Sequence, residues 1–349
     1  MKAVFNAVQL GHRPTRYLTH GNLVGYPEQP ERVRALLAGA RKAGADIRAA
    51  YAFEDAHIAS IHTERYLTFL DNAHAEWRGI EGSNLELMPS VRPVEPLAHY
   101  PESILGQAGW HLMDFACPIL EDTVRVAKAS VMTALTAAQL VADGEPVAYA
   151  LCRPPGHHAY ADRASGFCYL NNSAITAQFL RRLHEKVAIL DVDVHHGNGT
   201  QAIFYDRADV LTVSIHADPA TFYPFYWGYE EQAGRGAGRG YNINLPVPVR
   251  SDDEIWLGAL HYALERIAAY GPGALVVALG LDAHEADPLH GGAMTTAGFG
   301  RMAQGISSLG LPTVIVQEGG YMTAQLGDNL ASFLGEFQAS GPGALRQGW

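Results

Sequence analysis

The sequence of 349 residues predicts a single α/β domain, built on a doubly wound and mostly parallel sheet flanked by helices. Helical patterns alternate with short apolar runs from residue 123 onward. Those runs are continuous over four to six residues, which is typical of parallel strands buried on both faces. The chain length suits one large domain, and 48% apolar residues are enough for a sizeable core.

The elements can be placed in chain order. Helical patterns occur at 31–43 and 56–75 in an otherwise irregular first third. Residues 76–122 are rich in Gly, Pro and single aromatic residues, so we interpret them as a loop insertion. The later helices are expected at 123–141, 171–185, 252–270 and 296–309. The strands are expected at 147–151, 187–190, 210–215, 274–279 and 313–316.

Charge and cysteine content restrict the function classes. Lys and Arg number 25 against 36 Asp and Glu, a net charge of −11, which argues against nucleic-acid binding and suits a cationic substrate. The three cysteines form no CxxC pair, so a reducing, cytoplasmic compartment is expected rather than a disulfide scaffold. No signal-peptide run or uninterrupted apolar stretch of membrane-spanning length is visible, and no membrane association is expected.

Polar side chains gather where the predicted strands end. Asp193 and His195 follow one strand, Asp282 another and Tyr321 a third, and a pair of histidines follows the strand at 147–151. Ligands of open parallel sheets bind at the carboxyl ends of the strands, so these groups should share one rim. Taken singly, each would be read as an ordinary loop or core residue; their common placement favours a site.

Asp193, His195 and Asp282 are candidate ligands of one divalent cation. Asp193 and His195 are two residues apart on an extended segment, so their side chains point the same way. Two carboxylates and one neutral imidazole balance a 2+ ion and leave positions open for water and substrate. Zn²⁺ is the favoured metal, and Fe²⁺ or Co²⁺ also suits this ligand set.

Four further residues have chemistry that would serve such a centre. His157 and His158 follow a Pro-Pro-Gly turn and titrate near neutral pH, so they are candidate proton-transfer groups. Asp191 points to the opposite face from Asp193 and could orient a histidine ring. Tyr321 follows two glycines, where its hydroxyl could stabilise a developing oxyanion.

These motifs resemble the histone deacetylase and acetylpolyamine amidohydrolase superfamily, and bacterial acetylpolyamine amidohydrolases most of all. The resemblance covers roughly residues 26–321, in the family's order. It is carried by Arg-Pro-Pro-Gly-His-His at 153–158, Gly-Phe-Cys-Tyr-Leu-Asn at 166–171, 191–199, Gly-Leu-Asp at 280–282 and Glu-Gly-Gly-Tyr at 318–321. It implies the arginase/deacetylase-like fold.

The resemblance also implies roles for individual residues. Asp193, His195 and Asp282 would bind Zn²⁺, His158 would be the general base and acid, and Asp191 would partner His157. Tyr321 would hydrogen-bond the scissile carbonyl oxygen. Residues implied in substrate binding are Phe167, Gly166 and Tyr223 around a narrow channel, and Arg32 in an inner acetate-release pocket.

Structural K⁺ sites and a dimer belong to the same implied picture. One K⁺ would bind near Asp191, Asp193, His195, Ser214 and Ile215. A second would bind near Phe204, Arg207, Val210 and Tyr241. In the polyamine enzymes an early loop builds a homodimer that narrows the entrance, which the 76–122 insertion could do here.

Three positions depart from common family patterns. Asn198 stands where class I deacetylases carry Asp, and a neutral amide stabilises an imidazolium less than a carboxylate does. Tyr26 replaces a common His, and Tyr223 adds a hydroxyl where Phe is usual. None of the three removes a metal ligand.

The sequence therefore predicts hydrolysis of N-acetyl amides on cationic primary amines, foremost acetylpolyamines, with release of acetate. A broad acyl-lysine deacetylase, a non-catalytic small-ligand-binding protein and an arginase-like enzyme with two Mn²⁺ ions remain as alternatives. Acidic residues that could contact the substrate amine lie in the early loop, namely Glu102, Asp114, Glu121 and Asp122.

Overall fold

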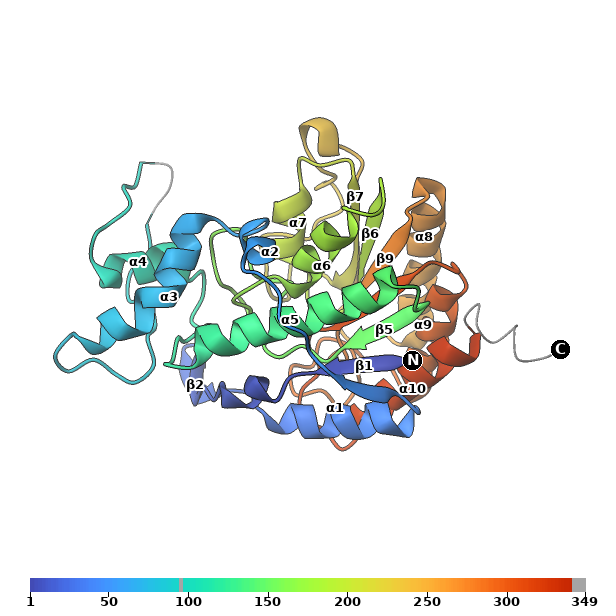
Figure 1. Ribbon diagram of the computed structural model, residues 1–349, viewed down its shortest axis with the longest axis horizontal. Helices are drawn as coiled ribbons and strands as arrows, with labels where there is room; N and C mark the ends of the chain where they lie inside the picture. The colour runs from blue at the N-terminus through green and yellow to red at the C-terminus, as the bar shows by residue number, and fades with distance from the viewer. Residues whose placement is uncertain (94–96, 341–349) are drawn as a thin grey trace.

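An eight-stranded sheet forms the centre of the computed structural model, which describes residues 1–93 and 97–340 (Figure 1). All neighbouring strands run parallel, in the order β4-β1-β5-β10-β9-β6-β7-β8. The strands are β1 (Lys2–Phe5), β4 (Asp46–Ala49), β5 (Val147–Ala150), β6 (Val187–Asp191), β7 (Val210–Ala217), β8 (Asn242–Val247), β9 (Ala274–Leu279) and β10 (Thr313–Gln317). The predicted doubly wound parallel sheet is confirmed.

Burial on both faces explains why the sequences of the inner strands do not alternate between polar and apolar residues. Every residue of β5, β6, β9 and β10 is buried. Alternate residues enter two separate cores: Ala148 and Ala150 pack in one, Val147 and Tyr149 in the other. Because both faces are covered, both sets of side chains must be apolar.

Helices cover the sheet on both sides (Figure 1). One face is packed by α5 and α6, together with α3, and the other by α1, α8, α9 and α10. Their bounds are α1 (Glu31–Lys42), α3 (Glu64–Arg78), α5 (Thr123–Ala142), α6 (Asn172–Leu180), α8 (Asp253–Tyr270), α9 (Thr296–Ser307) and α10 (Leu326–Ser340). None of the helices in the described part of the chain has the length and apolar character to cross a bilayer.

The first third is more regular than the sequence predicts. Strands β1 and β4 extend the sheet, and β2 (Arg16–Thr19) pairs with β3 (Asn22–Gly25) in a separate hairpin. The helix expected at 56–75 is two helices, α2 (Ala56–Ala59) and α3. The break lies at Thr63, whose extended backbone (φ −70°, ψ 147°) and side chain, accepting from Tyr66 N, start a new helix.

The described part of segment 76–122 contains a short helix, α4 (Ile104–His111), that packs on α3 (Figure 1). Leu87 and Ile119 exchange backbone hydrogen bonds of 2.9 and 3.0 Å, which close the base of this segment. Helix α7 (Asn198–Phe204) was also not predicted from the sequence; nor were β8 and α10.

Candidate active site

The candidate site lies at the carboxyl ends of the four central strands. His157 and His158 follow β5, Asp193 and His195 follow β6, and Asp282 and Tyr321 follow β9 and β10. These strands are neighbours in the order β5-β10-β9-β6. Strands β9 and β10 come last in the sequence but lie between β5 and β6 in the sheet. The topology therefore brings together segments more than 160 residues apart, at the rim where parallel sheets bind ligands.

The structure brings Asp193, His195 and Asp282 to one point. One ligand atom from each lies within 4.8 Å of the others, and all three residues are buried. His195 Nδ1 is 3.0 Å from Asp193 Oδ1 and 3.2 Å from Asp282 Oδ2. Backbone amides hold the carboxylates, since Val194 N donates to Asp282 Oδ1 and Gly319 N to Asp193 Oδ2.

Asp193, His195 and Asp282 form a cradle that fits a divalent cation. Asp282 Oδ2 is buried and lies 3.2 Å from His195 Nδ1, but the geometry between them is not that of a hydrogen bond. A buried carboxylate oxygen without a hydrogen bond is costly. The backbone closes tightly behind the ligands: a Cβ at Gly319 would lie 2.1 Å from Asp282 Oδ2, and one at Gly280 2.3 Å from Asp193 Oδ2. The donor set suits Zn²⁺, Fe²⁺ or Co²⁺ chemically.

Protons should compete with the metal for this cradle. Burial lowers the pKa of His195, but the carboxylates of Asp193 and Asp282 outweigh it and raise the pKa to about 9. As the pH falls through this value, His195 gains a proton that an incoming cation must displace. We therefore expect metal affinity to fall on acidification, by up to about tenfold per pH unit below about 9. Competition of the metal-free protein with a chelator of known affinity, at pH 9 and pH 6, measures this; equal affinities would contradict it.

The two histidines after β5 have different partners. His157 Nδ1 is 2.9 Å from Asp191 Oδ2, and His158 Nδ1 is 2.6 Å from Asn198 Oδ1. Asn198 also donates to the Tyr160 hydroxyl at 3.2 Å. A histidine bonded through Nδ1–H to an oxygen keeps Nε2 free as a proton acceptor. This arrangement suits His158, which lines the cavity described below, as a general base.

The electrostatic surroundings shift the pKa values of the two histidines in opposite directions. Burial lowers the pKa of His157, yet the carboxylates of Asp191 and Asp193 raise it to about 10. Burial and the neighbouring imidazoles of His157 and His195 bring the pKa of His158 well below its usual range. One histidine therefore favours the charged form and the other the neutral form, the pattern of a paired acid and base.

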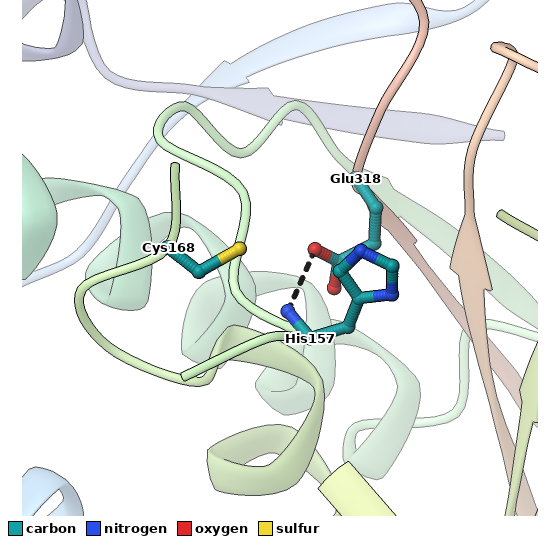
Figure 2. A group of neighbouring side chains, drawn as sticks. All are labelled: His157, Cys168 and Glu318. Carbon is teal, nitrogen blue, oxygen red and sulfur yellow. Dashed lines mark hydrogen bonds between the residues drawn. The ribbon is translucent and has the colours of Figure 1, made fainter. Parts of the chain in front are cut away.

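Glu318 fixes the histidine segment, and Figure 2 shows its carboxylate beside the His157 backbone N. Its Oε2 accepts from Gly156 N at 2.6 Å and His157 N at 3.0 Å, and its Oε1 accepts from Ser173 Oγ at 2.7 Å. Ligand-type atoms of His157, Cys168 and Glu318 lie within 4.8 Å of one another. Because the Glu318 oxygens and His157 Nδ1 already have partners, this cluster is a hydrogen-bonded support rather than a second metal site. The sequence motif contained Glu318 but gave it no role.

Asp287 and Arg32 hold Tyr321 in place. Its backbone N donates to Asp287 Oδ2 at 2.8 Å, and the Arg32 guanidinium lies 4.9 Å from its ring centre. Arg32 also donates to Gly320 O and Glu318 O, at 2.6 and 2.7 Å, and pairs with the buried Glu28 at 2.8 Å. Arg32 therefore supports the Gly-Gly-Tyr turn; it does not line the cavity at this rim. Sequence reasoning missed Asp287 and Glu28, which no local pattern marks.

A cavity of about 250 Å³ leads to these groups. Phe167 and Gly166, both with positive φ (71° and 52°), and Tyr223 form part of its wall, and their contact with substrate stays a prediction. The Tyr223 ring lies edge-on to His158, 5.1 Å away. The remaining lining residues are Tyr17, Leu18, Thr19, His20, Asp114, Ala116, His158, His195, Thr221, Phe222, Phe225, Leu289 and Tyr321.

The structure places the four acidic candidates of the early loop in different surroundings. Only Asp114 lines the cavity. Glu102 and Glu121 are exposed, and Asp122 pairs with Arg125 at 2.7 Å.

The segments named for potassium also converge. Asp191 and Ser214 are partners in the β6–β7 register, and Ile215 is the next residue of β7. Phe204 ends α7 and Val210 begins β7, while Tyr241 O accepts from Thr212 N at 3.0 Å. The Arg207 guanidinium lies 5.0 Å from the Phe204 ring. K⁺ binding at both places stays a prediction.

Comparison with known proteins decides the family. The histone deacetylase domain model matches residues 26–337. The chain belongs to the histone deacetylase family. It is 47% identical to the acetylpolyamine amidohydrolase of Burkholderia pseudomallei, over 99% of this chain and all of that protein. It is 38% identical to the acetylpolyamine amidohydrolase of Mycoplana ramosa, over 96% and 98% of the two chains.

A solved structure agrees with the sequence comparison. The crystal structure of the acetylpolyamine aminohydrolase from Burkholderia pseudomallei superposes with a TM-score of 0.94 at 46% identity, covering 97% of this chain and 99% of that one. The family resemblance recognised in the motifs is confirmed, and so is the arginase/deacetylase-like fold. The chain is an amidohydrolase of the histone deacetylase family.

Proposed function

We propose that the protein hydrolyses N-acetyl amides of cationic primary amines, acetylpolyamines above all, in a reaction that depends on one Zn²⁺ ion and releases acetate. The observation that carries this proposal is the convergence of Asp193, His195 and Asp282, because His195 lines one cavity together with His158 and Tyr321. A cation cradle, a neutral imidazole and a phenol are the groups that amide hydrolysis needs.

His158 and Tyr321 have different roles in the proposed reaction. His158, kept neutral by burial and its cationic neighbours, accepts a proton from the attacking water at Nε2. Tyr321 stays protonated, because burial and the nearby Asp282 charge raise its pKa well above the usual range, and donates to the developing oxyanion. An imidazolium then protonates the leaving amine. A bound Zn²⁺ ion, held by Asp193, His195 and Asp282, would polarise the acetyl carbonyl and lower the pKa of water.

The substrate class follows from the cavity and from the relatives. The walls contain aromatic rings and no Lys or Arg among the described residues, which suits a slim chain that carries positive charge. The two relatives named above are both acetylpolyamine amidohydrolases. The second candidate is a broad acyl-lysine deacetylase, since a relative from Pseudomonas aeruginosa, 36% identical, is called a histone deacetylase-like amidohydrolase.

A substrate panel on the Zn²⁺-reconstituted enzyme tests this proposal. We expect a higher kcat/KM for acetylputrescine than for an acetyl-lysine peptide, because the peptide backbone does not fit a slim channel. A markedly higher value for the peptide would favour the acyl-lysine deacetylase. Hydrolysis of neither substrate with any of Zn²⁺, Fe²⁺ or Co²⁺ would favour the non-catalytic ligand-binding alternative.

We also propose a homodimer, structural K⁺ at the two places described, and a cytoplasmic location. The insertion and hairpin carry exposed apolar side chains, among them Leu23, Leu85, Val91 and Leu97, which a second copy could cover. The three cysteines are buried and free, which suits a reducing compartment.

A further inference from the structure

We propose that Asp114 is the specificity-determining residue of the cavity, and that its carboxylate selects amides whose amine part carries an additional positive charge. This inference rests on the proposed amidohydrolase function and adds to it the residue that reads the substrate's charge.

Asp114 is fixed at the point where three segments meet. Its Oδ2 accepts from the Tyr223 hydroxyl at 2.6 Å, from Gly166 N at 2.8 Å and from Ser165 Oγ at 3.1 Å. Its Oδ1 accepts from Ala116 N at 2.9 Å. The segment between α4 and α5, the loop between β5 and α6, and the loop after β7 are thereby tied to one carboxylate. A carboxylate held by several donors cannot turn away from the cavity it lines.

The negative charge of Asp114 acts on the cavity without a direct cationic hydrogen-bond partner there. The four groups that donate to it are neutral, and the cavity lining, within the described residues, contains neither another carboxylate beyond Asp114 nor any Lys or Arg. The charge of Arg92 interacts electrostatically with Asp114, but Arg92 is not a lining residue. A cation in the cavity would therefore find one anionic side chain on its wall.

Gly166 and Tyr223 contact both the Asp114 carboxylate and the imidazole of His158. Gly166, whose N–H binds Asp114, lies against His158: a Cβ on Gly166 would be 2.3 Å from His158 Cδ2. Gly166 therefore links the Asp114 carboxylate to the imidazole that acts at the scissile amide. A second amine a few carbon atoms beyond that amide would lie on the Asp114 side of the channel.

The charge preference of Asp114→Asn tests the inference. The substrates are acetylputrescine and N-pentylacetamide, in which a methyl group replaces the terminal ammonium. Wild type should favour the cationic amide, and Asp114→Asn should reduce the ratio of the two kcat/KM values about tenfold, mainly through KM, as expected for the loss of one partly desolvated charge contact. A purely structural role would slow both substrates equally and leave the ratio unchanged, which would overturn the inference.

Two control variants separate charge from structure. Glu121→Gln removes an exposed acid outside the cavity and should leave both rates as in wild type. Tyr223→Phe removes the shortest hydrogen bond to Asp114 but keeps the charge of Asp114, so the ratio should be unchanged even where the rates fall. If Asp114→Asn does not fold, the wild-type ratio itself should decrease as salt is raised; a salt-independent ratio would overturn the inference. Failure of wild type to hydrolyse either amide would instead refute the proposed function.

Discussion

Tyr321→Phe should lower kcat about 10²–10³-fold, the loss measured when one oxyanion donor is removed elsewhere. The hydroxyl is the only change, because the ring remains packed edge-on to Phe167 and under Arg32. Substrate affinity and metal content should change little, since the donor matters mainly once negative charge develops on the carbonyl oxygen. Steady-state kinetics on metal-replete enzyme with acetylputrescine give kcat and KM separately.

Tyr26→Phe is the matched control for this variant. Tyr26 belongs to the same aromatic cluster, but its hydroxyl donates to Ala116 O at 2.9 Å. Its loss should cost about 1 kcal/mol of stability, the worth of an ordinary buried hydrogen bond, while kcat stays near wild type. Wild-type turnover by Tyr321→Phe, or an equal loss of kcat in both variants, would remove Tyr321 from the reaction.

The inner sheet and the cation cradle could be predicted because the signal is local. Buried parallel strands such as β6 and β9 have no polar residue before their last position, and Asp193, His195 and Asp282 follow them directly. Strand β4, by contrast, lies at the sheet edge and has the sequence Asp-Ile-Arg-Ala. Its exposed polar residues give no continuous apolar run from which a strand could be predicted. Strand β1 is only four residues long and begins with Lys2.

The supporting polar residues could not be predicted, because their partners are distant in sequence. Glu28 binds Arg153 over 125 positions and Arg32 over one helical turn, and neither contact has a sequence pattern that separates it from a surface ion pair. Asp114 was one of four equivalent acids in the early loop until the structure placed it in the cavity wall. Residue type indicates the chemistry of a site, whereas long-range packing decides which copy of that residue type takes part.

Asp282→Asn should abolish activity and metal binding together. The substitution keeps the size of the side chain and an acceptor for Val194 N, whose hydrogen bond to Oδ1 is 3.1 Å. It removes one of the two negative charges that balance a 2+ ion, and it places an amide group where Oδ2 has no hydrogen-bond partner. Mutating groups that only orient metal ligands costs about 10–100-fold in affinity, so loss of a ligand should cost at least ~10²-fold.

Elemental analysis after dialysis, together with kcat measured with added Zn²⁺, checks this result. Wild type should retain one transition-metal ion per chain, which also distinguishes it from an arginase-like centre with two. Asp218→Asn is the control, because Asp218 follows the neighbouring strand β7 but only caps a turn through Ala220 N at 2.9 Å. Full metal content and turnover in Asp282→Asn would show that the ion is not held by these three residues. Since the proposed reaction and the charge preference of Asp114 both depend on that ion's place, this variant is the most demanding test of the site.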